Sequence, residues 1–232
     1  MPERPGGALA KRPLQFIYVV DVSGSMTGQK IESLNLAVRE SIPPMQDEAH
    51  NNPNAEVLVR VVQFSDGAQW LVSQPTPVHQ FSWTDLDAGG GTDMGQAMLL
   101  LADALSVENM PPRGLPPVIV LVTDGMPTDD FNAGLRSLLD QPWGKRAVRI
   151  GVAIGDDADM SALEKFIGNP EVRPLRATNV QDLVKKIRWA STVPLRAASS
   201  PTSGMAGGSG TGNVPIPAAV ADTPPHSDDD IF

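Results

Sequence analysis

Two stretches of this chain are apolar at nearly every position, whereas most surface-facing strands would alternate apolar and polar residues. They are LQFIYVV at 14–20, in which Gln15 is the exception, and VIVLV in the predicted strand VIVLVTD at 118–124, and both are rich in β-branched residues. A strand with one buried face alternates apolar and polar residues, whereas a parallel strand covered on both faces is continuously apolar. The two runs therefore predict strands of a sheet with helices on both sides, with 14–20 at its centre.

Segments with helical periodicity alternate with these and other strand-like runs. Further strands are predicted at 56–65, 147–155 and 172–177, and helices over 31–42, 98–105, 131–139, 160–167 and 180–187. This alternation predicts an α/β fold with a doubly wound, mostly parallel central sheet. AQWLV at 68–72 follows a turn at Asp66-Gly67, so we expect it to form one short antiparallel edge strand. Pro43-Pro44 is expected to break the first helix.

Composition divides the chain into three parts. Residues 1–13 are rich in Pro, Gly and charge and predict a flexible arm, and 14–196 carry the strand and helix pattern. Residues 197–232 are rich in Ser, Gly, Pro and Ala and acidic at the end, so we expect a disordered tail. Its last residues, SDDDIF, are interpreted as a solubilising end, with a short peptide ligand as the alternative.

Charge and composition exclude several classes of function. The chain has no cysteine, which leaves oxygen or histidine ligands for any metal. Its net charge of −9 argues against a nucleic-acid-binding face. No apolar stretch is long enough to span a bilayer, and the N-terminus lacks the apolar segment of a signal peptide. We therefore expect a cytoplasmic location and no membrane partner.

Small oxygen-bearing side chains gather where three loops leave or approach predicted elements. The loops read DVSGS at 21–25, GGGTD at 89–93 and TDG at 123–125. Ligand sites of parallel sheets lie at the carboxyl ends of strands, so these loops are expected to meet. Alternate side chains of a turn can face one centre, which would bring together Asp21, Ser23, Ser25, Thr92 and Asp124. Two carboxylates and three hydroxyls suit Mg²⁺ or Mn²⁺, and Ca²⁺ less well.

These motifs resemble the metal-ion-dependent adhesion site (MIDAS) of von Willebrand factor A domains. The resemblance covers about 14–193 and implies the same five residues as metal ligands, with no position departing from the motif. It also implies a protein–protein interaction module that is not an enzyme, in which an acidic side chain of another protein completes the metal shell. PLQFIYVVDVSGSMTGQKIESLN and VQDLVKKIRWASTV further resemble the bacterial tellurium-resistance (TerY-type) proteins. That closer resemblance implies a stress-response or signalling system with a protein kinase and a PP2C-type phosphatase as partners.

Other interpretations of the same residues remain open at this point. Ser23 and Ser25 could serve only as helix caps. A magnesium-dependent phosphoryl-transfer hydrolase is the enzymatic alternative, although Ser23 stands where such enzymes usually carry a second aspartate. A scaffold with a purely structural metal is the third. The remaining acidic residues near strand ends, Asp66, Asp93, Asp129, Asp130, Asp156 and Asp157, are interpreted mainly as caps.

Overall fold

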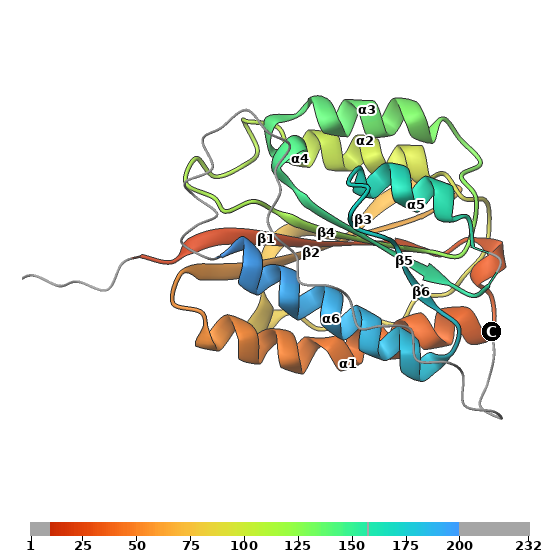
Figure 1. The fold of residues 1–232 in the computed structure, drawn as a ribbon, viewed down its shortest axis with the longest axis horizontal. Coiled ribbons are helices and arrows are strands. Elements are labelled where there is room, and N and C mark those ends of the chain that lie inside the picture. The colour runs from red at the N-terminus through yellow and green to blue at the C-terminus, as the bar shows by residue number, and fades with distance from the viewer. Residues whose placement is uncertain (1–9, 157, 200–232) are drawn as a thin grey trace, which may run out of the picture.

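A computed structural model of the chain describes residues 10–156 and 158–199 (Figure 1). Its sheet has the strand order β3-β2-β1-β4-β5-β6. The strands are β1 (Arg12–Asp21), β2 (Ala55–Ser65), β3 (Gly67–Pro77), β4 (Val118–Thr123), β5 (Val148–Ile154) and β6 (Leu175–Ala177). The helices are α1 (Gln29–Asn51), α2 (Met94–Ala104), α3 (Phe131–Asp140), α4 (Pro142–Arg146), α5 (Met160–Ile167) and α6 (Val180–Ala198), with 3₁₀ turns at Gly24–Met26 and Val78–Gln80. All strand pairs are parallel except β2 with β3, so the predicted doubly wound α/β fold is confirmed.

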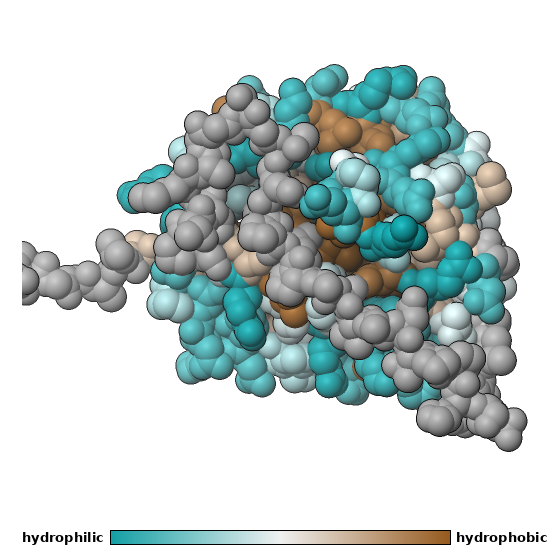
Figure 2. All heavy atoms as spheres, in the orientation of Figure 1, coloured by the Kyte–Doolittle hydropathy of each residue, from teal (hydrophilic) through white to brown (hydrophobic). Residues whose placement is uncertain are grey.

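The first apolar run lies at the centre of the sheet, as predicted. β1 pairs with β2 on one side and β4 on the other. Phe16 and Tyr18 pack into the core beneath α1 and α6, whereas Ile17 and Val19 pack beneath α2, α3 and α5. Figure 1 shows these helices as two layers, one on each face of the sheet. In Figure 2 the outer surfaces of α1 and α3 are mostly hydrophilic, and hydrophobic residues appear between α5 and α6.

The antiparallel edge strand is present but longer than the predicted 68–72. β3 extends over Gly67–Pro77 and pairs with β2 with two register shifts. Its second half, with Ser73, Gln74 and Pro75, is largely exposed and carries no apolar alternation. An edge strand needs only one ladder of hydrogen bonds, which tolerates proline and polar residues that would exclude a central strand.

The prediction that Pro43-Pro44 would break the first helix is wrong. α1 continues through both prolines. The two carbonyls that lose their partners belong to Arg39 and Glu40, which are exposed, so water can satisfy them. The helix beyond the prolines is held by burial of Met45, which is fully inaccessible to solvent. Tertiary packing of the helix here outweighs the free-energy cost of the backbone hydrogen bonds that the two prolines remove.

The ends of the folded part differ slightly from 14–196. β1 begins at Arg12, whose side chain reaches carbonyls of the loop before β4. α6 reaches Ala198, and the buried Ser199 accepts a 2.6 Å hydrogen bond from Asn52. These contacts hold the terminal residues to the fold. The rest of the proposed arm and tail, and Asp157, lie outside the described residues, and the three-part division stays a prediction.

Two further differences concern short elements. β6 covers only Leu175–Ala177 of the predicted 172–177, and α4 was not predicted because it spans a single turn. Among the described residues, no helix is both long enough and apolar enough to cross a membrane.

The single tyrosine of the chain gives a direct test of the packing. Tyr18 is fully buried, its hydroxyl lies 2.8 Å from Ser41 Oγ, and burial raises its pKa from 10.0 to about 12. A raised pKa means that stability is fully present below pH 10 and is lost as pH rises toward 12, by about 2–3 kcal/mol in all. We expect the ultraviolet absorbance of tyrosinate to stay absent at pH 10 to 11 until the chain unfolds. Tyr18→Phe is the blank, and tyrosinate formation near pH 10 in the folded protein would contradict this packing.

Candidate metal centre

Three loops meet at the carboxyl edge of the parallel strands, where the sequence motifs place them. The Gly24 amide donates to the Gly90 carbonyl at 2.9 Å, and the Gly89 amide donates to the Val22 carbonyl at 2.8 Å. The loop after β4 joins them through the Thr128 amide, which donates to the Thr92 carbonyl at 2.9 Å. Backbone hydrogen bonds therefore fix the relative positions of all three motifs.

The hydroxyls of Ser23 and Ser25 contact each other, and that of Ser25 contacts the Asp124 carboxylate and not a helix end. Ser23 Oγ lies 3.0 Å from Ser25 Oγ, and Ser25 Oγ donates to Asp124 Oδ1 at 2.7 Å. Ser23 precedes the 3₁₀ turn without a side-chain cap bond, and α1 begins after Gly28, whose φ of 76° places it in the left-handed region. The interpretation of these serines as helix caps is therefore wrong.

Asp21 is buried and held from two sides. Its Oδ1 accepts from the Ser23 amide at 2.8 Å and its Oδ2 accepts from Thr123 Oγ1 at 2.5 Å. Burial raises the pKa of Asp21, the nearby charge of Asp124 raises it further, and the hydrogen bonds from Thr123 and Ser23 oppose the shift. A cation held near Asp21 would therefore stabilise the charged form of its carboxylate.

Thr92 lies on the same side of the site as Ser25. A methyl group added at Gly125 would sit 3.6 Å from Ser25 Oγ and 3.7 Å from Thr92 Oγ1, so the two hydroxyls flank that glycine. Thr92 is only 7% exposed. Its hydroxyl makes no hydrogen bond within the part of the chain that the structure describes, so it is available to a ligand.

Residues outside the predicted set hold the Thr92 loop in place. Thr128 Oγ1 accepts from the Thr92 amide at 2.9 Å and donates to Asp93 Oδ1 at 3.0 Å. Asp93 Oδ2 in turn accepts from the Gly67 amide at 2.8 Å. Asp66 accepts from the Gly91 amide at 2.7 Å. Asp66 and Asp93 thus brace loops, and no local sequence signal distinguishes Thr128 from other loop threonines.

Two other acidic residues act as caps, as expected from their positions. Asp129 accepts from the Gly95 and Gln96 amides at the start of α2, each at 2.8 Å. Asp130 is the N-cap of α3 and accepts from the Ala133 amide. These bonds tie the loop after β4 to both helices that follow the site.

Lys30 is a member of the site that sequence reasoning missed. Its Nζ lies 2.7 Å from Asp124 Oδ2, and the side chain of Asp124 is fully inaccessible to solvent. Lys30 is the second residue of α1, a position that suggests only a solvated helix surface. Its role depends on the approach of β4, which lies far away in the sequence.

The donor set is limited to oxygen atoms of two kinds. Nowhere in residues 10–156 and 158–199 do three or more His, Cys, Asp or Glu side chains form a cluster able to hold a metal. The site instead combines the carboxylates of Asp21 and Asp124 with the hydroxyls of Ser23, Ser25 and Thr92. Neutral hydroxyls and carboxylates are ligands of hard divalent cations, so these residues fit such an ion.

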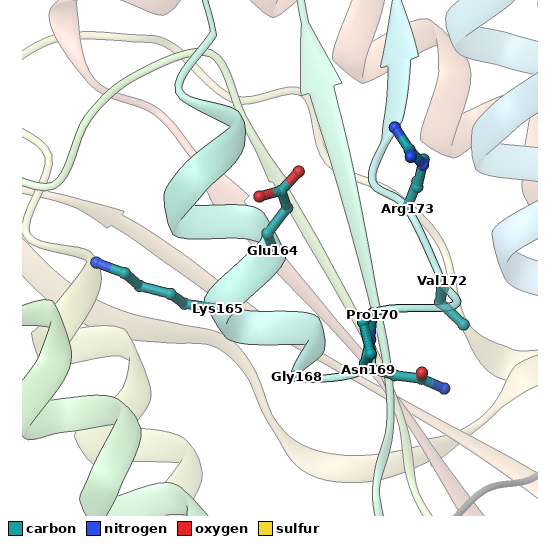
Figure 3. A pocket seen from close by; sticks show the side chains of 7 residues that line it. All are labelled: Glu164, Lys165, Gly168, Asn169, Pro170, Val172 and Arg173. Carbon is teal, nitrogen blue, oxygen red and sulfur yellow. The ribbon is translucent and has the colours of Figure 1, made fainter.

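A separate hollow of about 470 Å³ lies at the opposite edge of the sheet (Figure 3). Its lining residues are Glu164, Lys165, Gly168, Asn169, Pro170, Val172 and Arg173. Lys165 points away from Arg173 in Figure 3, so the two cations do not converge on one ligand position. We assign no function to this hollow.

The fold and the site together define a class: a doubly wound α/β domain with hydroxyl and carboxylate side chains gathered at the carboxyl edge of its sheet. The family model of the von Willebrand factor type A domain matches residues 16–126. Residues 16–126 are therefore similar in sequence to the von Willebrand factor type A domain, a common protein–protein interaction module.

Curated relatives match by sequence, and two of them are human proteins. Human inter-alpha-trypsin inhibitor heavy chain H6 is 30% identical over 165 residues, which cover 65% of this chain and 12% of the relative. Human inter-alpha-trypsin inhibitor heavy chain H4 is 30% identical over 131 residues, covering 52% of this chain and 13% of the relative. The chain thus spans roughly an eighth of the length of these relatives.

Solved structures share the fold at low sequence identity. A von Willebrand factor type A protein from Catenulispora acidiphila superposes with a TM-score of 0.59 and 19% identity, covering 78% of this chain and 42% of that one. The pilus adhesin SpaC from Lactobacillus rhamnosus GG, in its open conformation, gives 0.61 and 14%, covering 78% and 30%. Proximal thread matrix protein 1 from the mussel byssus, described with zinc occupying its MIDAS motif, gives 0.58 and 16%, covering 78% and 48%.

Proposed function

We propose that this chain is a divalent-metal-dependent protein–protein interaction module. The observation that carries the proposal is that Ser25 Oγ contacts both Ser23 Oγ and Asp124 Oδ1, and that neither of these two serine hydroxyls caps a helix among the described residues. The proposed ligands are Asp21, Ser23, Ser25, Thr92 and Asp124, and the proposed metal is Mg²⁺ or Mn²⁺. A bound ion would supply a positive charge at the rim, where an acidic side chain of another protein completes the shell.

The hydrogen bonds among the loops around the site support this function, because they fix the loops so that little reorganisation is needed when an ion binds. Thr92, Asp93 and Thr128 are joined in one hydrogen-bonded chain, and Asp21 is held by Ser23 and Thr123. A preorganised oxygen set binds a metal without the cost of ordering its loops. The zinc in the MIDAS motif of the mussel byssus protein supports a divalent ion at this position of the fold.

For the biological setting we propose a bacterial, cytoplasmic stress or tellurium-resistance system with a protein kinase and a PP2C-type phosphatase as partners. Its support is the TerY-type resemblance of residues 13–35 and 180–193. In this setting the domain binds proteins and catalyses no reaction. A phosphatase assay with Mg²⁺ on a generic phosphate ester tests that point, since turnover that vanishes in Asp21→Asn would identify a hydrolase.

Removing the Thr92 hydroxyl should weaken the metal site without harming the fold. The hydroxyl makes no hydrogen bond among the described residues, so Thr92→Val leaves no donor unpaired and keeps the volume. We expect Mn²⁺ affinity, measured by titration calorimetry or by the paramagnetic signal of free Mn²⁺, to fall by about tenfold or more. The metal-free melting temperature should stay within about 2 °C of the wild type.

Thr84→Val is the matched control, because Thr84 is exposed on the loop before the site and lies outside the ligand set. Equal Mn²⁺ affinity in wild type and Thr92→Val would remove Thr92 from the ligand set. A purely structural metal is distinguished by repeating a pull-down with and without EDTA. If chelation lowers only the melting temperature and leaves the captured partners unchanged, the metal does not bridge to them.

A further inference from the structure

We propose that Lys30 is an internal counter-cation of the metal site, which stabilises the metal-free state and weakens metal binding. The inference rests on the proposed function, because it concerns the same five-residue site. It starts from the contact between Lys30 Nζ and Asp124 Oδ2 at 2.7 Å. Lys30 thus affects the affinity of the site for the metal without being one of the proposed ligands.

Lys30 occupies a position that is unfavourable for a lysine in two respects. It is the second residue of α1, where the positive end of the helix dipole repels a cation. Its side chain is also only 15% exposed, which removes most of the hydration of its ammonium group. The ion pair with the Asp124 carboxylate opposes both costs, so the contact with the site favours a lysine where the helix position does not.

The two oxygens of Asp124 have different partners. Oδ1 accepts from Ser25 Oγ at 2.7 Å and so faces the hydroxyl cluster, whereas Oδ2 is held by Lys30. A cation bound among the hydroxyls would use Oδ1, directly or through water. Lys30 then either remains on Oδ2, close to a second positive charge, or leaves Oδ2 and loses its ion pair with Asp124.

Lys30 weakens metal binding whether it stays on Asp124 or leaves it. Repulsion opposes the ion if Lys30 stays, and a broken ion pair opposes it if Lys30 leaves. In the metal-free protein the same ammonium compensates Asp124, which lies close enough to Asp21 to disfavour its charge. Lys30 therefore lowers the affinity of the site for the metal because it stabilises the metal-free state.

The test compares Mn²⁺ binding and metal-free stability in wild type, Lys30→Met and Lys30→Arg. Lys30→Met keeps the length of the side chain and removes its charge. We expect its Mn²⁺ affinity to rise by about tenfold or more, and its melting temperature in EDTA to fall. The increase in melting temperature on adding Mn²⁺ should therefore be larger than in wild type, which can be measured even if the metal-free variant is poorly folded. Lys30→Arg should resemble the wild type.

Lys145→Met controls for the change in net charge, because Lys145 is exposed on α4, away from the site. An unchanged or weaker Mn²⁺ affinity in Lys30→Met, with binding by the wild type, overturns the role of Lys30 and leaves the proposed metal site standing. Binding by Lys30→Met but not by the wild type supports the inference and shows that Lys30 closes the site. Absence of binding in both proteins overturns the inference and the proposed function together.

Discussion

Asp21→Asn is expected to reduce Mn²⁺ affinity by about 100-fold or more while leaving the metal-free protein as stable as the wild type or more stable. The metal would lose a charged ligand at the end of β1. The metal-free fold would lose a carboxylate that is 0% exposed and whose pKa is raised by burial and by Asp124. A buried group with a raised pKa costs stability in its charged form at neutral pH, and asparagine carries no charge.

Asparagine can also keep both local hydrogen bonds. Its carbonyl oxygen can accept from the Ser23 amide, and its amide group can donate to Thr123 Oγ1 once that hydroxyl rotates. Calorimetric titration with Mn²⁺ and thermal melting in EDTA measure the two effects separately. Glu32→Gln, on an exposed residue of α1, is the matched control. Retained affinity in Asp21→Asn would exclude Asp21 as a ligand, and a large loss of metal-free stability would show that its charge has a structural role.

Gly134→Ala is expected to destabilise the fold by about 3 kcal/mol or more, although alanine is the better helix former. A Cβ at Gly134 in α3 would lie 2.3 Å from the carbonyl oxygen of Gly95 in α2. The atom met is backbone, so the two helices must separate to admit the methyl group. Because Gly95 is the second residue of the helix that follows Thr92, separation would also disturb the Thr92 loop.

Urea unfolding followed by circular dichroism measures this change. Asn132→Ala is the control, since Asn132 is exposed on the same helix and should change stability by no more than about 0.5 kcal/mol. Equal stability of Gly134→Ala and wild type would mean that α2 and α3 do not approach each other as closely as described here.

The centre of the fold was predictable because continuous apolar runs require two covered faces. β1 and β4 have every residue buried from Leu14 to Asp21 and from Val118 to Thr123. The edges were less predictable because an edge strand such as β3 needs neither burial nor a regular pattern. The course of α1 through Pro43-Pro44 depends on contacts of the buried Met45, which no local rule contains.

The same distinction applies to the candidate site. Its five proposed ligands stand in short motifs at strand ends, and the structure brings those motifs together at one edge. Thr123, Thr128 and Lys30 were missed because each acts on a residue from a distant segment: Thr123 on Asp21, Thr128 on Thr92 and Lys30 on Asp124. Such pairings depend on the order of strands in the sheet, which a motif does not encode.

The position of α6 affects how the chain can fold as it is synthesised. α2, α3 and α5, which cover one face of the sheet, are complete by Ile167, whereas the other face needs α6, which ends at Ala198. Until α6 emerges from the ribosome, side chains such as Phe16 and Tyr18 on β1 are covered only by α1 and by the segment after β3, which includes Phe81 and Trp83. The nascent chain therefore passes through a half-covered stage with an apolar surface open to solvent, the kind of surface that chaperones bind. Docking of α6, secured by the hydrogen bond between Asn52 and Ser199, ends that stage.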